Sequence, residues 1–263
     1  MKLNFMAWFM VLSSSVIAAA QEYSIPSPNK KITVLVGLAN GKPYYKINNI
    51  KTPVLESSKL GIIRDDTDFS TGLTLLSASA IKPITDNYQL LSGKRSVNVY
   101  KANKQIFHYV NASGKLLDII FQVSNDGVAF RYYFPENSTG TRKILEEITS
   151  FRFPVQAKAW LQPLADAKSG WSQTNPSYEE FYEQGIPVGT PSPIRAGWVY
   201  PALFRCDSTN WVLITETFPD GNYCATRLKA ESPNGEYSVG FPQAPEIFTN
   251  GALLPESALP WYS

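Results

Sequence analysis

Histidine, cysteine and charge are scarce in this sequence. Its 263 residues include one histidine and two cysteines, and only 17% are Asp, Glu, Lys or Arg. The histidine, His108, lies in the middle of a strand pattern, where a half-buried structural residue is the expected interpretation. A histidine-based catalytic triad is therefore excluded, and one His with two distant Cys lacks the ligand spacing of a zinc site.

Long apolar runs are also missing beyond the amino terminus. Lys2, the apolar residues 5–17 and Ala18-Ala19-Ala20 have the pattern of a secretory signal peptide over residues 1–20. We therefore expect an exported, periplasmic protein with no membrane attachment after signal cleavage. The 24 basic and 22 acidic residues are scattered along the chain, which argues against a nucleic-acid partner.

Export permits disulfides, but the two cysteines are predicted to be free and buried. Cys206 ends one predicted strand, residues 211–216 form the next, and Cys224 lies early in a third. In a simple meander the outer strands are about twice 4.8 Å apart, beyond the roughly 7 Å Cα limit for a disulfide.

Period-two alternation is the dominant pattern. Ile32, Val34, Val36 and Leu38 alternate with other residues, Asn40-Gly41 then favours a tight turn, and residues 44–50 return. Further strands are predicted over residues 97–100, 105–110, 116–123, 128–134, 144–153, 158–161, 198–205, 211–216, 223–229 and 236–241.

Turn residues between these strands predict an antiparallel meander, with a turn at residues 219–222 joining 211–216 to 223–229. The best candidate for a helix is a short one at residues 178–183. The sequence therefore predicts an all-β fold, a large antiparallel two-sheet sandwich.

Residues 163–195 stand apart as a long connection with five prolines. Loops of this length in compact domains are usually functional or disordered, and its aromatic residues argue against disorder. Within it, Glu179, Glu180 and Glu183 alternate with Tyr178, Phe181 and Tyr182, after Trp171. Two interpretations stay open here: a solvated helical turn anchored by aromatics, or a site where a Glu reaches a hard cation or a sugar hydroxyl.

The other carboxylates give weaker signals. Hydrolysis of a glycosidic bond needs two carboxylates that face each other across the bond. Glu146 and Glu147 are neighbours on a predicted strand and so lie on opposite faces. Asp65-Asp66-Thr67-Asp68 is predicted to be a solvated turn, because no glycine or closing Glu follows at calcium-loop spacing.

The order of several motifs resembles the amino-terminal domain of glycoside hydrolase family 97, over residues 21–263. These motifs are Ser27-Pro28-Asn29, Tyr44-Tyr45, Ser57-Ser58-Lys59-Leu60-Gly61, Asn125-Asp126-Gly127-Val128-Ala129-Phe130-Arg131-Tyr132, Tyr178-Glu179-Glu180-Phe181-Tyr182 and Pro260-Trp261. The resemblance implies a β-supersandwich like that of galactose mutarotase-like domains, normally followed by a catalytic (β/α)8 barrel. Family members are exported, largely by Bacteroidetes, and act on α-linked oligosaccharides with bound calcium.

The resemblance also implies roles for individual residues. The amino-terminal domain of the family directs one glutamate toward the calcium ion, and the motif match assigns this role to Glu179, with Glu180 as the fallback. Trp171, Tyr178 and Tyr182 are expected at the substrate or domain interface. No catalytic residue is expected in this chain, because a barrel needs about 250 residues beyond the point where the sequence stops.

The sequence leaves other functions open. One is a self-standing mutarotase-like sugar epimerase, which needs an acid and a base beside the anomeric carbon. Another is a β-sandwich that binds a separate partner, such as a catalytic barrel on another chain, through an exposed apolar patch.

Overall fold

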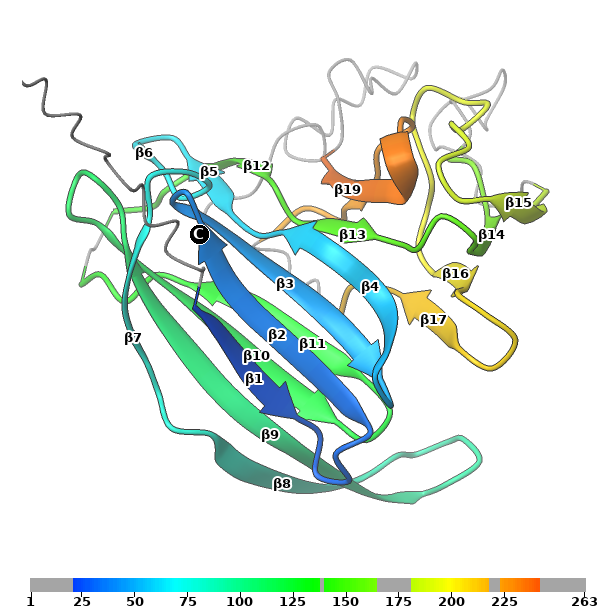
Figure 1. Cartoon of the computed structure of the whole chain (residues 1–263), viewed down its shortest axis with the longest axis horizontal. Helices are drawn as coiled ribbons and strands as arrows, with labels where there is room; N and C mark the ends of the chain where they lie inside the picture. Colours follow the sequence, from blue (N-terminus) through cyan, green and yellow to red (C-terminus); the bar gives the residue numbers. More distant parts are fainter. Residues whose placement is uncertain (1–20, 138–139, 165–180, 218–222, 242–263) are drawn as a thin grey trace, which may run out of the picture.

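The computed structural model describes residues 21–137, 140–164, 181–217 and 223–241, and strands dominate these ranges (Figure 1). Every strand pair in these ranges is antiparallel, and the one helical piece there is a short 3-10 turn, η2 (Pro233–Gly235). None of the described helical structure is long and apolar enough to cross a membrane.

The first layer is a four-stranded sheet in simple sequence order. It contains β1 (Glu22–Pro26), β2 (Ile32–Ala39), β3 (Lys42–Asn49) and β4 (Thr52–Lys59). Asn40 and Gly41 join β2 to β3 with φ of 52° and 74°, the left-handed values that a two-residue hairpin turn requires. The predicted hairpin is confirmed.

The second layer is a five-stranded sheet around one very long strand. It contains β7 (Thr74–Ala78), β8 (Lys82–Gln89), β9 (Val97–Val110), β10 (Leu116–Ser124) and β11 (Val128–Tyr133). The first half of β9 pairs with β8 and its last residues pair with β7, while β10 and β11 continue the sheet as a meander.

An aromatic core fills the space between these two layers, which lie face to face in Figure 1. Tyr45 of the first layer lies 6.1 Å from Phe121 and 5.3 Å from Phe130 of the second, between ring centroids. Tyr23 and Phe107 form a similar edge-on pair at 5.6 Å. Aromatic pairs at these separations contribute packing beyond the burial of area, so the predicted two-sheet sandwich is confirmed.

Three smaller sheets extend the sandwich. They are β12-β5-β6, β13-β19-β18 and β15-β14-β16-β17. Their strands are β5 (Ile62–Arg64), β6 (Thr67–Asp68), β12 (Ile144–Glu147), β13 (Ser150–Arg152), β14 (Lys158–Leu161), β15 (Glu183–Pro187), β16 (Ala202–Arg205), β17 (Trp211–Ile214), β18 (Arg227–Leu228) and β19 (Glu236–Gly240).

Two serine hydroxyls join this extension to the first layer. The amide of Lys59 in β4 donates to Ser150 Oγ at 2.8 Å, and the amide of Arg152 in β13 donates to Ser58 Oγ at 2.9 Å. These serine hydroxyls accept the backbone N–H bonds that would otherwise go to a carbonyl of the neighbouring strand. They therefore connect β4 of the first sheet to β13 of the extension.

Several predictions about this second part of the chain are wrong. Residues 211–216 and 223–229 do not form a hairpin, because β17 pairs with β16 whereas β18 pairs with β19. The part of residues 178–183 that the structure describes is not helical, since Glu183 begins β15. The cysteines are nevertheless both free and buried, as predicted, although the meander used to predict this does not exist.

Candidate functional site

The loop expected to carry the chemistry starts and ends on adjacent strands. β14 and β15 are antiparallel neighbours, with Leu161 opposite Glu183. Residues 165–180 lie outside the described ranges, and with them Trp171, Tyr178, Glu179 and Glu180. Their predicted roles therefore stay predictions, but both ends of their loop are held at the same end of one strand pair.

Tyr182 is the one predicted interface residue that the structure describes. It precedes β15 and is 42% exposed, and the adjacent Phe181 is 93% exposed. Neither ring is packed into the core of the described part of the chain, so these two aromatics do not anchor the loop there. Tyr182 is accessible at the foot of the loop.

A second aromatic group lies on the same sheet and escaped the sequence analysis. The rings of Trp160 on β14 and Trp211 on β17 are 4.9 Å apart between centroids. The Arg205 guanidinium on β16 lies 5.8 Å and 5.7 Å from the two ring centres, within reach of a cation–π interaction. Strand register brings these side chains together, and register between distant strands cannot be deduced from sequence periodicity alone.

A cavity of about 1120 Å³, here called the sandwich cavity, lies in the described part of the chain. Its walls come from both layers and from the extension, chiefly β11, β12, β17 and residues 223–226. Its apolar wall includes Val54, Val128, Phe130, Ile144, Val212, Ile214 and Val239. Its polar wall includes Tyr132, Glu147, Thr149, Tyr200, Glu216, Tyr223 and Thr226.

Among the carboxylates that line the sandwich cavity, Glu147 and Glu216 are each held by neutral donors. Glu147 Oε2 accepts a hydrogen bond of 2.8 Å from the Tyr223 hydroxyl. Glu216 accepts from the Thr226 amide at 3.0 Å and 3.1 Å and from the Thr226 hydroxyl at 2.8 Å. Glu146, in contrast, pairs with Lys229 at 2.8 Å on the surface, which confirms that Glu146 and Glu147 point to opposite faces.

Hydroxyl groups extend this polar wall. The Tyr132 hydroxyl lies 2.8 Å from Thr149 Oγ1 and accepts a bond of the same length from the Gly61 amide. Thr149 also hydrogen-bonds Glu147, and Thr226 hydrogen-bonds Tyr200. The polar side of the cavity is thus a continuous set of hydroxyls and carboxylates.

Burial sets the protonation of this wall. It raises the pKa of Glu147, to which the nearby Glu216 carboxylate adds, and it raises the pKa of Glu216 as well. Burial, reinforced by Glu147, also raises the pKa of Tyr223 far above its ordinary value, so this hydroxyl stays a donor. The hydroxyls and carboxylates around Glu147 and Glu216 can therefore donate and accept hydrogen bonds. The cavity lining also includes Arg64, Arg131 and Arg142, but the hydrogen bonds to the two carboxylates named above come from hydroxyls and an amide.

His108 does not contribute to the sandwich cavity. It lies on β9, and its Nδ1 is 2.7 Å from Asp118 Oδ1 on the neighbouring strand. The structural role predicted for His108 is consistent with this position, and the cavity carboxylates have no histidine beside them among its lining residues.

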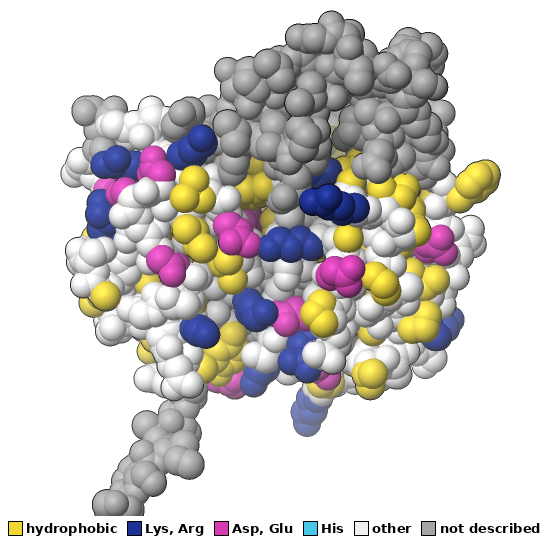
Figure 2. Space-filling model, turned by 90° about the horizontal axis from the view of Figure 1, so that it is seen from above, with side chains coloured by type: hydrophobic (Ala, Val, Ile, Leu, Met, Phe, Trp, Pro, Cys, Tyr) yellow, Lys and Arg dark blue, Asp and Glu magenta, His cyan; other side chains and the backbone are white. Residues whose placement is uncertain are grey.

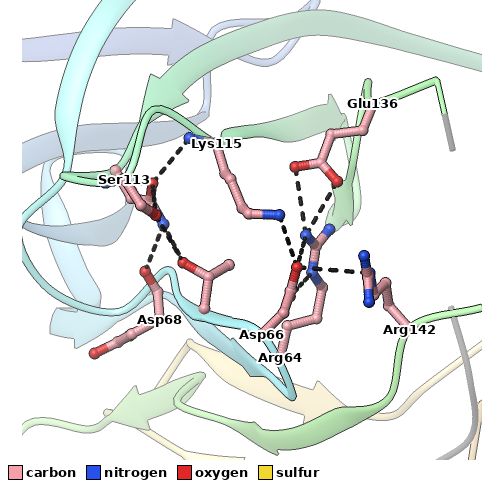
Figure 3. Close-up of polar contacts among 9 residues, drawn as sticks. Arg64, Asp66, Asp68, Ser113, Lys115, Glu136 and Arg142 are labelled. Atoms are coloured by element: carbon pink, nitrogen blue, oxygen red, sulfur yellow. Dashed lines mark hydrogen bonds and ion pairs between the residues drawn. The ribbon is translucent and has the colours of Figure 1, made fainter.

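The Asp65-Asp66-Thr67-Asp68 segment forms the turn between β5 and β6, but it is more than a solvated turn (Figure 3). Asp66 accepts hydrogen bonds from the buried Arg64 at 2.8 Å and 3.0 Å, and Lys115 lies 2.8 Å from it. Glu136 binds the same guanidinium at 3.0 Å, and Phe134 stacks on it at 4.6 Å. Asp65, Asp66 and Asp68 are exposed, as the prediction of a solvated turn requires, and the hydrogen bond from Arg64 lowers the pKa of Asp66.

Comparison with known proteins identifies the family. The family model described as "Glycosyl-hydrolase 97 N-terminal" matches residues 25–262. The chain belongs to this family. The glycoside hydrolase 97 resemblance seen in the sequence motifs is therefore confirmed, together with its all-β sandwich fold.

Relatives of this family 97 domain are glycosidases by name. A probable retaining alpha-galactosidase of Streptomyces bingchenggensis is 29% identical over 208 residues, which cover 79% of this chain and 29% of the relative. A crystal structure of a beta-arabinopyranosidase has a TM-score of 0.84 and 36% identity, with 92% of this chain and 38% of that chain covered. A family 97 enzyme from Pseudoalteromonas sp. strain K8, solved with panose, shares the fold at a TM-score of 0.66 and 20% identity, with 83% of this chain and 31% of that chain covered. This chain spans about a third of the length of these proteins.

The family 97 domain offers no ready metal site in its described part. No group of three or more His, Cys, Asp or Glu side chains there is arranged to hold a metal ion. The described residues alone therefore do not fit calcium, and Glu179 lies outside them. On the face shown in Figure 2, basic and acidic side chains are interspersed rather than gathered by sign.

Proposed function

We propose that this chain is the amino-terminal module of a glycoside-hydrolysing assembly, in which a catalytic (β/α)8 barrel on the same or another polypeptide cleaves an α-linked oligosaccharide. The carrying observation is the family match over residues 25–262, together with relatives named as glycosidases that are about three times longer. The module alone is expected to be inactive, because hydrolysis needs two facing carboxylates from the barrel.

The module would contribute its β14–β15 loop to that assembly. Both ends of the loop are fixed on adjacent strands, with Leu161 opposite Glu183, which gives its residues a rigid base. Glu179 is proposed as one oxygen ligand of a calcium ion, with Glu180 as the fallback, and the remaining ligands would come from the barrel. Tyr182, exposed at the foot of the loop, would contact substrate or barrel together with Trp171 and Tyr178.

A domain exchange tests this function. This module would replace the corresponding domain of the 36% identical beta-arabinopyranosidase, and hydrolysis of α-galactosides, α-glucosides and β-arabinopyranosides would be measured with and without calcium. We expect activity that Glu179→Gln lowers and that added calcium partly restores. Glu183→Gln, a change in the described strand β15, is the matched control and should leave activity unchanged.

The outcomes separate the parts of the proposal. A soluble exchange protein without activity on any of these glycosides contradicts the module function. Activity that is equally sensitive to Glu179→Gln and Glu183→Gln contradicts the specific role of Glu179. Loss on Glu180→Gln alone would move the ligand to the fallback residue.

Export is proposed on the basis of residues 1–20, which lie outside the described ranges. The mature protein recovered from a periplasmic fraction should begin near Gln21, as read by amino-terminal mass spectrometry. Recovery of the intact chain with Met1 in the cytoplasmic fraction would contradict this localisation.

A further inference from the structure

The sandwich cavity has the size of a ligand site. At about 1120 Å³ it is slightly larger than the roughly 300–1,000 Å³ of ordinary small-molecule pockets. Its lining is also mixed, with aliphatic and aromatic side chains beside hydroxyls and carboxylates. Pockets that bind small molecules have this combination, in which the apolar surface provides affinity and a few polar groups fix the orientation.

The carboxylates of the cavity can accept further hydrogen bonds from a ligand. A carboxylate accepts about four hydrogen bonds. Glu147 receives bonds from Tyr223 and Thr149, so part of its acceptor capacity still faces the cavity. The Tyr223 hydroxyl donates to Glu147 and can accept in turn. Such acceptors are matched by ligand hydroxyl groups, which both donate and accept.

The charge of the wall restricts which ligand fits. The hydrogen-bond partners of Glu147 and Glu216 are hydroxyls and an amide rather than basic side chains. Three arginines also line the cavity. Arg64 is paired with Asp66 and Glu136, Arg142 lies 3.5 Å from Asp66, and Arg131 is an exposed residue of β11. An anionic ligand would meet two partly buried carboxylates that have no basic partner, and like charges repel. A neutral ligand avoids this repulsion.

The aromatic wall suits the carbon face of a sugar ring. Phe130, Tyr132 and Tyr223 line the cavity. A pyranose has an apolar C–H face for such rings and hydroxyls around its rim for the carboxylates. We propose that the sandwich cavity is a binding site for a neutral saccharide of one to three rings, held by Glu147, Glu216 and Tyr223.

This site would belong to the module itself. None of its named residues comes from the β14–β15 loop, and the proposal does not depend on calcium or on Glu179. The proposed site gives the module a second role, saccharide binding, beside its proposed association with a catalytic barrel. Saccharide binding can be tested in the absence of a barrel.

The test is saccharide binding to the full mature chain, followed by isothermal titration calorimetry and ligand-observed saturation-transfer NMR. Melibiose, maltose and maltotriose are the neutral probes, and glucuronate is the anionic probe. We expect at least one neutral probe to bind and glucuronate to bind about tenfold more weakly or not at all. Glu147→Gln and Glu216→Gln should each weaken binding by about tenfold or more, the usual effect of losing a charged hydrogen-bond acceptor.

Matched controls locate the site. Glu146→Gln changes the adjacent carboxylate on the opposite face of β12 and should bind like the unmodified chain. Glu179→Gln should also bind like the unmodified chain, which distinguishes this site from the proposed calcium ligand. Thermal unfolding identifies variants that have lost the fold, and Tyr223→Phe, which removes one hydroxyl, provides a milder second change in the same wall.

Three results would overturn the proposal. They are the absence of binding by every neutral probe at millimolar concentration, equal binding of glucuronate, and unchanged binding by folded Glu147→Gln, Glu216→Gln and Tyr223→Phe. Loss of binding on Glu179→Gln with no effect of the cavity variants would instead assign the saccharide to the loop.

Discussion

The two halves of this sandwich have different interiors. Between the first and second layers, side chains such as Tyr45, Phe107 and Phe121 form a closed aromatic core. Where the small sheets of the extension meet these layers, the interior instead keeps a cavity walled by Glu147, Glu216 and several hydroxyls. One fold thus combines a region organised for stability with a region that leaves polar groups facing open space.

Which side chains of a strand face the interior depends on its alternation and on where a register shift interrupts it. In β9, alternation over residues 105–110 directs Phe107 and Tyr109 into the core, whereas Val97 and Val99 in the first half of the strand are exposed. β12 has a register shift between Ile144 and Glu146, so an extra residue interrupts the alternation. As a result Ile144 is buried, Leu145 and Glu146 lie at the surface, and Glu147 reaches the cavity.

The largest expected effect is in the aromatic core. Phe121 is fully buried and its ring contacts Tyr45, Phe107 and Phe130. Phe121→Ala should lower the free energy of unfolding by about 3–5 kcal/mol, measured by urea denaturation. Phe181→Ala, at a ring that is 93% exposed, should change it by less than about 0.5 kcal/mol. Similar losses in both variants would show that the core does not dominate stability.

The next largest loss of stability is expected at the buried guanidinium of Arg64, which forms ion pairs with Asp66 and Glu136. Arg64→Ala removes a guanidinium that is 1% exposed and leaves Asp66 and Glu136 without it. Because both acids are partly solvated, we expect a loss of about 2–3 kcal/mol, below the range for fully buried pairs.

The surface pair of Arg152 and Glu56, 3.4 Å apart and about half-exposed, is the control for that change. Arg152→Ala should cost less than about 1 kcal/mol. An Arg64→Ala variant as stable as Arg152→Ala would mean that the buried guanidinium of Arg64 stabilises the fold no more than a surface pair does.

Sequence patterns predict many individual strands in both halves, but they miss polar strands and do not define which strands pair. β2, β3, β10, β11 and β14 follow their predicted ranges closely, because apolar alternation and turn residues agree there. β8 was missed because nearly all its residues are exposed and polar, so no apolar period marks it. β17 and β18 were wrongly paired because alternation defines strands but not their partners.

The candidate sites show the same limit. Glu179 and its neighbours were found because carboxylates and aromatics are adjacent in sequence. Glu147 is far from Glu216 and Tyr223 in sequence, and only the folded chain brings them together. The opposite-face argument for Glu146 and Glu147 was the one available signal that a carboxylate points inward.

A smaller effect tests the cavity through pH. Since burial raises the pKa of Glu147 above the ordinary 4.5, its contribution to stability is present below that pH and is lost as the pH rises toward the folded-state value. Glu147→Gln keeps an acceptor for Tyr223 but cannot ionise. Its unfolding free energy should therefore fall less steeply than that of the unmodified chain above pH 4.5, by up to about 1.4 kcal/mol per pH unit.

The matched variant for this titration is Glu146→Gln. Glu146 is paired with Lys229 at the surface, so this variant controls for the loss of a neighbouring carboxylate that lies outside the cavity. If the pH profile of Glu147→Gln runs parallel to that of the unmodified chain, the cavity carboxylate ionises in the folded protein as easily as in water, and the contrast between the two interiors is smaller than described.

The smallest effect concerns the thiols, which lie in the core of the extension. Burial raises the pKa of Cys206 to about 11, and its Sγ donates to the Val54 carbonyl at 3.4 Å. At pH 8 the native protein should therefore react slowly with a thiol reagent, because the thiolate is the reactive form. Denaturation without reductant should release two rapidly reacting thiols, and Cys206→Ser should release one. Fast reaction of the native protein would mean that the extension opens readily whereas the aromatic core stays closed, and an absence of thiols after denaturation would mean that Cys206 and Cys224 are bonded.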